Sequence, residues 1–175
     1  FTRSHPPPPI NLSDRDYFRE HRDNPAAGNF ISVPVKNKGN GKWVFYISRR
    51  LNDSQGNFLG LVIVGISVAG TAEFYQRVGE GLGKGAAINL FRRDFTLLTR
   101  WPPAEELIGK QNTRGTTFDI IQQQGLNAGV MVSATPRFIN PDQPAQRMGG
   151  ARLVNRYPLV VGVTITDDFY LANWR

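Results

Sequence analysis

The chain of 175 residues has no cysteine and only two histidines. Without cysteine it cannot form a disulfide framework, a cysteine-ligated zinc site or a catalytic thiol. Neither His5 nor His21 has a second histidine two or four positions away, so the sequence contains no such zinc motif. The Gly-x-Ser-x-Gly turn of an α/β-hydrolase is missing as well. These absences favour a segment without enzymatic activity, and we expect no catalytic residue, metal or cofactor.

Long apolar runs are absent too. No stretch reaches the ~18 consecutive apolar residues that a membrane-spanning helix requires, and no secretory signal peptide is recognisable. Because the first residue is Phe1 rather than Met, we expect the chain to be part of a longer protein. The lack of cysteine also fits an oxidising compartment, where a stray thiol is a hazard.

Acidic residues are fewer than basic ones, which leaves a net charge of +7. A basic chain invites a nucleic-acid partner, but here the charges are scattered and are not interleaved with aromatic residues at a spacing suited to base stacking. We therefore expect no nucleic-acid partner. Two other causes of the charge remain open, namely an anionic membrane surface nearby or a pocket for an anionic ligand.

The residues that are present predict an α+β fold. Hydrophobic residues make up 40% of the chain, which is enough for a packed core. Short helices and strands follow one another with local connections, which favours antiparallel sheets over βαβ units. Glycines at 79, 81, 83 and 85 suggest a boundary between two modules, over residues 1–80 and 81–175.

Each module has its own series of predicted elements. In the first, a proline-rich lead-in precedes a helix with Ser13 as N-cap, and a nearly continuous apolar run predicts a central buried strand over 58–68. The other elements of this module are strands over 30–35 and 43–49 and a helix over 71–78, while the first helix covers 14–22. The second module has predicted strands over 86–91, 96–100, 129–134, 150–155 and 159–166, and helices near 104, over 117–124 and in the tail 167–175.

One helical turn combines charge with aromatic side chains, in the sequence Ser-Asp-Arg-Asp-Tyr-Phe over residues 13–18. The guanidinium of Arg15 can bind a carboxylate in bidentate fashion, with aromatic rings beside it walling off an apolar group. Alternatively, Tyr17 and Phe18 belong to the core and Arg15 forms an internal ion pair with Asp14 or Asp16. The residues alone leave both interpretations open.

The order of segments resembles a known family. The segments NLSDRDYFREHR, FISVPV, GKWVFYISRRLND and GNFLGLVIVGI, followed by LFRRDFTLLTRWP, GVMVSATPR, RYPLVVGVTI and LANWR, are similar to the double CACHE (dCACHE) sensor domains of bacterial receptors. The likeness is greatest to the periplasmic regions of membrane-bound diguanylate cyclases and sensor histidine kinases, and it covers nearly the whole chain.

This resemblance implies two tandem PAS-like modules in the periplasmic part of an inner-membrane protein. A small ligand would bind in the first, membrane-distal module, and the signal would pass to a cytoplasmic output domain, either a diguanylate cyclase or a histidine kinase of a two-component system. The long N-terminal helix of the family, its flanking transmembrane helices and the output domain would lie outside this chain. A homodimer is compatible with the resemblance.

The resemblance also suggests ligand-binding residues. Amino-acid-binding members hold the ligand carboxylate through the arginine of an Arg-x-Trp-Tyr element, which Arg15 and the residues after it match, with Tyr17 in place of the tryptophan. An aspartate that binds the ligand amine is replaced by Ser67, which disfavours an α-amino acid and leaves a carboxylate, another anion or an empty pocket. Strand alternation places Tyr46 and Ser48 on one face and Phe45 on the other. Phe30 and Ser32 follow the first helix in a loop that could close over a ligand. The expected set is therefore Arg15, Tyr17, Phe30, Ser32, Tyr46, Ser48 and Ser67.

The function that we expect is therefore sensing of a small ligand, a carboxylate or another anion, outside the cytoplasm. The alternative is a CACHE-like interaction or dimerisation module without a small ligand, which would signal through protein contacts.

Overall fold

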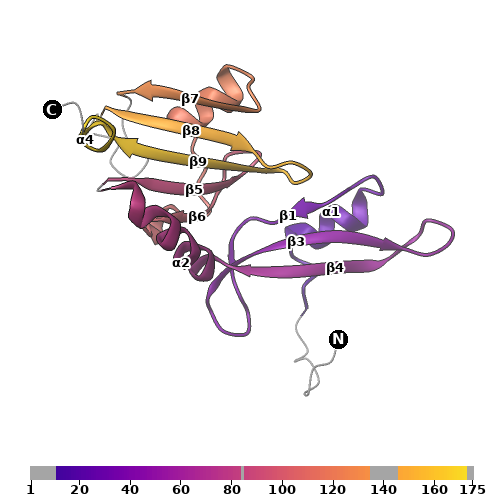
Figure 1. Ribbon diagram of the computed structural model, residues 1–175. Helices are drawn as coiled ribbons and strands as arrows, with labels where there is room; N and C mark the ends of the chain where they lie inside the picture. Colours follow the sequence, from indigo (N-terminus) through magenta and orange to yellow (C-terminus); the bar gives the residue numbers. More distant parts are fainter. Residues whose placement is uncertain (1–10, 84, 135–145, 173–175) are drawn as a thin grey trace. The chain divides into compact units, whose positions relative to one another are not determined.

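The computed structural model of the chain describes residues 11–83, 85–134 and 146–172. It divides into two compact units, Phe1–Gly65 and Ile66–Arg175, each with its own antiparallel sheet (Figure 1). The predicted α+β class is confirmed. The division falls after Gly65, ahead of the position predicted from the glycines. Parts of the predicted lead-in (1–10) and of the C-terminal helix (173–175) lie outside the described residues.

The first unit consists of one helix and a small sheet centred on β3. Strands β1 and β2 pair with different parts of β3, and β4 also pairs with β3. Because Pro34 has no amide hydrogen to donate, it separates β1 from β2, as its position in the sequence predicts. The elements are α1 (Asp16–Asp23), β1 (Phe30–Ile31), β2 (Val35–Lys36), β3 (Trp43–Asn52) and β4 (Phe58–Ser67).

The predicted burial of β4 is wrong. Leu59 is 68% exposed, and Val62 and Val64 are exposed as well. Among the described strands β4 has one partner, β3, so one of its edges and much of its surface have no described neighbour. A continuous apolar run shows that a strand can be buried, and it does not show what covers the strand.

The second unit contains a five-stranded antiparallel sheet in the order β6-β5-β9-β8-β7. All five of its strands were predicted from the sequence, to within a few residues at each end. The strands are β5 (Ala87–Arg92), β6 (Leu97–Trp101), β7 (Ala128–Ser133), β8 (Arg147–Leu153) and β9 (Leu159–Thr166). The helical elements are α2 (Val68–Gly79), η1 (Glu80–Leu82), η2 (Glu105–Leu107), α3 (Thr116–Phe118), η3 (Asp119–Gln123) and α4 (Asp167–Tyr170).

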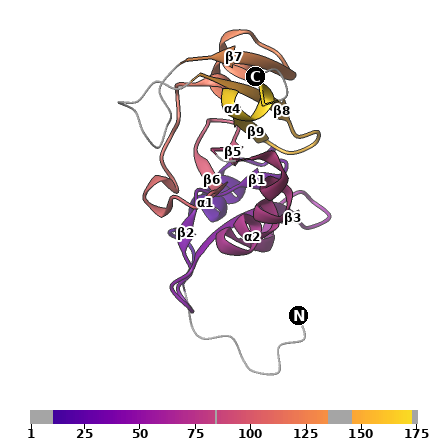
Figure 2. The same ribbon diagram turned by 60° about the vertical axis from the view of Figure 1, so that its left-hand side comes forward.

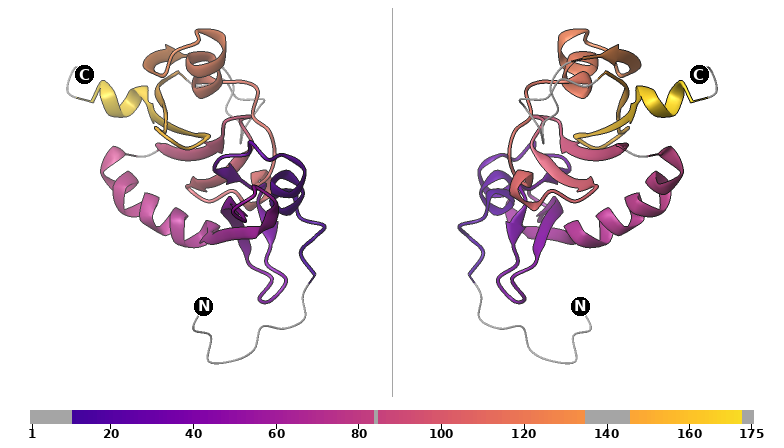
Figure 3. Two further views of the ribbon diagram at one scale, coloured as in Figure 1. Left: turned by 90° about the vertical axis from the view of Figure 1, so that its right-hand side faces the viewer. Right: turned by 90° about the vertical axis from the view of Figure 1, so that its left-hand side faces the viewer.

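Helix α2 lies on one face of this sheet and follows β4 directly in the chain (Figure 3). Its Val68 carbonyl accepts a hydrogen bond from the Thr99 hydroxyl at 3.0 Å. Gly79 lies so close to Trp101 that a Cβ there would stand 2.2 Å from the indole ring. Because Gly79 has no side chain, α2 can pack directly against β6 at this point.

The pair α3 and η3 lies on the opposite face, where it covers β8 and β9 (Figure 2). A Cβ at Gly149 would stand 2.3 Å from the Thr116 hydroxyl oxygen, and one at Gly162 would stand 2.2 Å from that of Thr117. The two glycines therefore allow the start of α3 to approach the strands closely.

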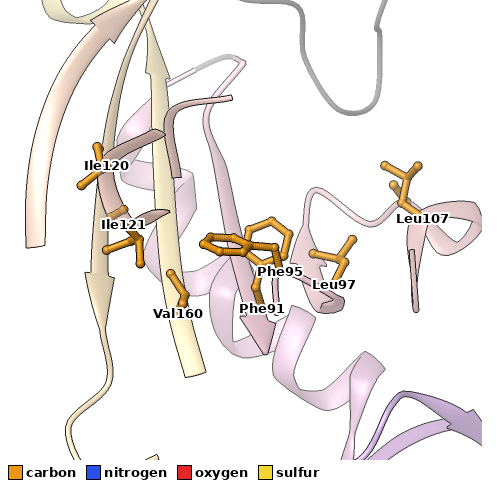
Figure 4. Close-up of a cluster of buried hydrophobic side chains, with 9 residues drawn as sticks. Phe91, Phe95, Leu97, Leu107, Ile120, Ile121 and Val160 are labelled. Atoms are coloured by element: carbon orange, nitrogen blue, oxygen red, sulfur yellow. The ribbon is translucent and has the colours of Figure 1, made fainter. Parts of the chain in front are cut away.

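The core of the second unit fills one end of this same face (Figure 4). Phe91 and Phe95 contact each other with ring centroids 6.5 Å apart, and the side chains of Leu97 and Val160 are fully buried. Burial of such a side chain contributes about 1.5–3 kcal/mol, so this cluster stabilises the unit and holds η3 against the sheet. No helix in the described part of the chain is long and apolar enough to cross a membrane.

Candidate ligand-binding site

Arg15 stands at the very start of α1. Its backbone is extended, and its carbonyl accepts the amides of Phe18 and Arg19, both at 3.1 Å. Arg15 is therefore the N-cap residue, in place of the predicted Ser13. The Ser13 amide donates to the side chain of Asn11 at 2.9 Å, in a local turn that ends before the helix begins.

The two carboxylates beside Arg15 have other partners. Asp16 accepts the amide of Val33 at 2.8 Å and thereby ties the loop after β1 to the start of α1. Asp14 pairs with Lys38 at 3.3 Å, and this hydrogen bond lowers the pKa of the Asp14 carboxyl. Neither ion pair that the sequence allowed for Arg15 is formed. The Arg15 guanidinium makes no ion pair or side-chain hydrogen bond with any described residue.

Two tyrosines pack together next to this arginine. The rings of Tyr17 on α1 and Tyr46 on β3 are tilted by 56° with centroids 5.1 Å apart, and Tyr17 is buried. Burial is the main cause that raises the pKa of Tyr17 to about 12, so its phenol stays neutral. The Tyr46 hydroxyl accepts a hydrogen bond from the side-chain Nδ2 of Asn37 at 3.2 Å. The pair forms an aromatic wall with polar tips.

A buried histidine lies one turn further along α1. The Nε2 atom of His21 is 2.9 Å from the hydroxyl oxygen of Ser48, and that hydroxyl donates to the Phe30 carbonyl at 3.4 Å. A Ser48 proton directed at the Phe30 carbonyl leaves Nε2 of His21 as the donor to Ser48 and places the lone pair on Nδ1. Nδ1 is buried and has no hydrogen-bond partner among the described residues. Burial lowers the pKa of His21, which favours the neutral ring.

The side-chain alternation predicted for β3 is confirmed. Tyr46 and Ser48 both contact α1, through Tyr17 and His21 respectively. Phe45, which precedes Tyr46 in the strand and has the opposite orientation, is fully buried. The face of β3 that carries the polar groups is therefore the face that α1 covers.

Two of the expected serines have their hydroxyls engaged by the backbone. Ser32 is buried, donates to the Val33 carbonyl at 2.8 Å and accepts the Tyr46 amide at 2.9 Å, which joins the end of β1 to β3. Ser67 is the N-cap of α2 and accepts the Gly70 amide at 3.1 Å.

Six of the seven expected residues therefore belong to the first unit. They lie on α1 or at its N-cap, on β1 or just after it, and on β3, and contacts join most of them. Ser67 belongs to the second unit. His21 was not predicted as a partner of this cluster. Its spacing of four residues from Tyr17, which places both on one face of a helix, is the signal that identifies it.

Comparison with known proteins places this fold. No protein-family model and no curated protein matches the sequence. Among solved structures, the extracellular domain described as that of histidine kinase rpHK1S-Z16 is 32% identical, with a TM-score of 0.74 over 97% of this chain. The periplasmic sensory domain of the Campylobacter jejuni chemoreceptor Tlp1 is 15% identical, with a TM-score of 0.66 over 90% of this chain.

A third similar structure is the ligand-binding domain of the Pseudomonas aeruginosa amino-acid chemoreceptor PctB in complex with L-Gln, which is 14% identical, with a TM-score of 0.64 over 98% of this chain. The chain spans 66%, 57% and 64% of the lengths of these three structures. The chain therefore has the α+β fold of the extracellular and periplasmic sensor domains of histidine kinases and chemoreceptors.

Proposed function

We propose that the chain is the extracytoplasmic sensor domain of a receptor anchored in the inner membrane, and that its first unit binds a small carboxylate or another anion through Arg15. The observation that carries this proposal is the Arg15 guanidinium, which lacks an ionic partner among the described residues while Asp14 and Asp16 are engaged elsewhere. Arginine with open donors suits a planar carboxylate, because two parallel N–H···O bonds can form.

The surroundings of Arg15 support an anionic ligand. The N-terminus of α1 adds a partial positive charge at this point. The tyrosine pair would contact an apolar part of the ligand. Several similar structures contain amino acids, among them PctB with L-Gln, CtaA from Pseudomonas fluorescens with L-isoleucine and Mlp24 with asparagine. Ser67, in place of the aspartate expected for an amine, supports a carboxylate without an α-amino group in this chain.

Binding would act through a shift between two arrangements of α1. The helix is tied to the loop after β1 by Asp16 and to the loop after β2 through Asp14 and Lys38. A ligand held by Arg15 would favour the arrangement in which its contacts are strongest, and the size of the shift equals its difference in affinity for the two arrangements. In a double CACHE receptor this shift would reach a cytoplasmic diguanylate cyclase or histidine kinase through the flanking membrane helices.

A thermal-unfolding screen against carboxylates, amino acids and inorganic anions tests this function. A ligand present at 100 times its Kd adds about 2.7 kcal/mol to the free energy of unfolding. For a chain of this size that raises Tm by roughly 5–10 °C. We expect a carboxylate to shift the wild type and Arg19→Gln, and not Arg15→Gln. Arg19 is the matched control because it lies on the same helix, is exposed and carries the same charge.

If no compound shifts the wild type, or if Arg15→Gln responds as the wild type does, binding through Arg15 is wrong. The second candidate function, a module that dimerises without a small ligand, then gains weight. The exposed apolar side chains of Leu59, Val62 and Val64 on β4 favour it. Sedimentation equilibrium of wild type and Val62→Lys tests it, because a dimer through β4 should dissociate in the variant.

A further inference from the structure

The second unit contains a polar cavity that none of the expected binding residues lines. Its volume is about 50 Å³, and it is partly open to solvent. Since a water needs roughly 10–15 Å³ of such space, the cavity has room for roughly four water-sized groups, about the size of acetate or phosphate. Its walls come from β5, β6, β8 and β9, and from the start of α3 with the residues before it.

The register of the strands brings distant residues together in this cavity. Asn89 on β5 lies opposite Arg100 on β6 and opposite Gly162 on β9. On β8, Gly149 lies opposite Thr164, so Arg147, two residues earlier, points to the same face of the sheet. The same face is apolar at its other end, where the core cluster lies. The polar end is therefore a distinct region of the second unit.

One arginine of the cavity is fixed in place by the protein. Nη1 of Arg100 donates to the Asn89 side chain at 3.1 Å, and its Nε donates to the Pro102 carbonyl at 3.0 Å. Both bonds hold the guanidinium plane at the cavity wall. A preorganised guanidinium loses little conformational entropy when an oxyanion binds.

Two buried hydroxyls line the cavity beside these arginines. Thr116 and Thr117 are 4% and 6% exposed, because the start of α3 packs closely on Gly149 and Gly162. No hydrogen bond joins either threonine hydroxyl to a described residue, and neither oxygen is among the fully buried atoms without a partner, so both keep some exposure at the cavity. These two hydroxyls are therefore available as donors to a bound group.

The charge of the lining has one sign. Arg100, Arg114 and Arg147 line the cavity, and none of the described lining residues is acidic. An anion that enters meets guanidinium, amide and hydroxyl groups, and no described carboxylate repels it. We propose that this cavity is a second ligand site, which binds a compact oxyanion such as a carboxylate or phosphate group independently of Arg15.

Isothermal titration calorimetry with sodium acetate and with sodium phosphate, at constant ionic strength, tests the proposal. The informative variants are Arg114→Gln, at an exposed position that folding should tolerate, and Thr116→Val, which keeps the side-chain volume. Each removes one hydrogen bond to an anion and should weaken binding about tenfold. The control is Arg152→Gln, which removes the same charge from an exposed site on β8 and should bind as the wild type does.

The tighter binder of the two, acetate or phosphate, shows whether the site prefers a carboxylate or a phosphate group. The Arg15→Gln variant separates this site from the one in the first unit, and it should keep the affinity. In amide NMR of the wild type, the titration should move the signals of Thr116, Thr117 and Gly149. No saturable binding of either anion, equal binding by Arg114→Gln and Thr116→Val, or loss of binding in Arg15→Gln would each overturn the proposal.

Discussion

Gly162→Ala introduces one methyl group at the closest approach between α3 and the second sheet. The new Cβ would stand 2.2 Å from the Thr117 hydroxyl oxygen and 3.2 Å from both Cβ and Cγ2 of that residue. The backbone of Gly162 does not have the positive φ that would strain an alanine, so the cost is steric. Overpacking of this kind costs about 1–3 kcal/mol, and the smaller entropy of the unfolded alanine chain offsets about 0.4–1 kcal/mol. We therefore expect a net loss of about 1–2 kcal/mol in the free energy of unfolding.

The clash also predicts which second substitution restores stability. Thr117→Ala removes the hydroxyl and leaves only the contact with Cβ, so the double variant should recover most of the loss. Thr117→Ser keeps the oxygen and should not. Gly150→Ala is the control, since its Cβ would meet the Val130 methyl at an ordinary 3.7 Å.

Urea unfolding followed by circular dichroism measures these differences, and the double-mutant cycle isolates the coupling between positions 117 and 162. If Gly162→Ala is as stable as Gly150→Ala, or if Thr117→Ser rescues as well as Thr117→Ala, the close packing of α3 on β9 is wrong.

Three further predictions concern the first unit. Burial lowers the pKa of His21 below the ordinary 6.5, so the wild type should lose stability as the pH falls through 6.5, and His21→Gln, which keeps a donor for Ser48, should lose less. Urea titrations at several pH values measure this difference, and equal pH dependence would contradict it. Asp16→Ala removes the acceptor of the Val33 amide and should cost about 1 kcal/mol, as measured by urea unfolding; an unchanged midpoint would contradict the bond. Leu59→Ser should change stability by less than about 0.5 kcal/mol, because the side chain is 68% exposed; a larger loss in the same assay would show that β4 is covered.

Much of the fold could be predicted because its signals are local. The interruption at Pro34, the hairpin turn around Gly56 and the strands of the second sheet each depend on a few neighbouring residues. Turn chemistry is an example, since the Asp53 carboxylate accepts the amides of Gln55 and Asn57, both at 2.8 Å. Such signals do not say what covers a strand, which explains the error on β4.

The functional groups were harder to predict, because they depend on contacts between distant residues. The sequence motif at Arg15 could be identified, but the competition between Asp14, Asp16 and a ligand for its guanidinium is decided by Lys38 and Val33. Pairs formed across the fold, such as His21 with Ser48, need the register of the strands. The cavity of the second unit needs it even more, since its arginines and threonines lie on four separate segments.

The central claim is that Arg15 holds an anionic ligand. Isothermal titration calorimetry tests it most directly, with the carboxylate that gives the largest thermal shift titrated into wild type, Arg15→Gln and Arg19→Gln. We predict saturable binding to the wild type and to Arg19→Gln, and affinity reduced by at least about tenfold in Arg15→Gln, since a charged hydrogen bond is lost. Equal affinity of all three proteins would contradict the claim.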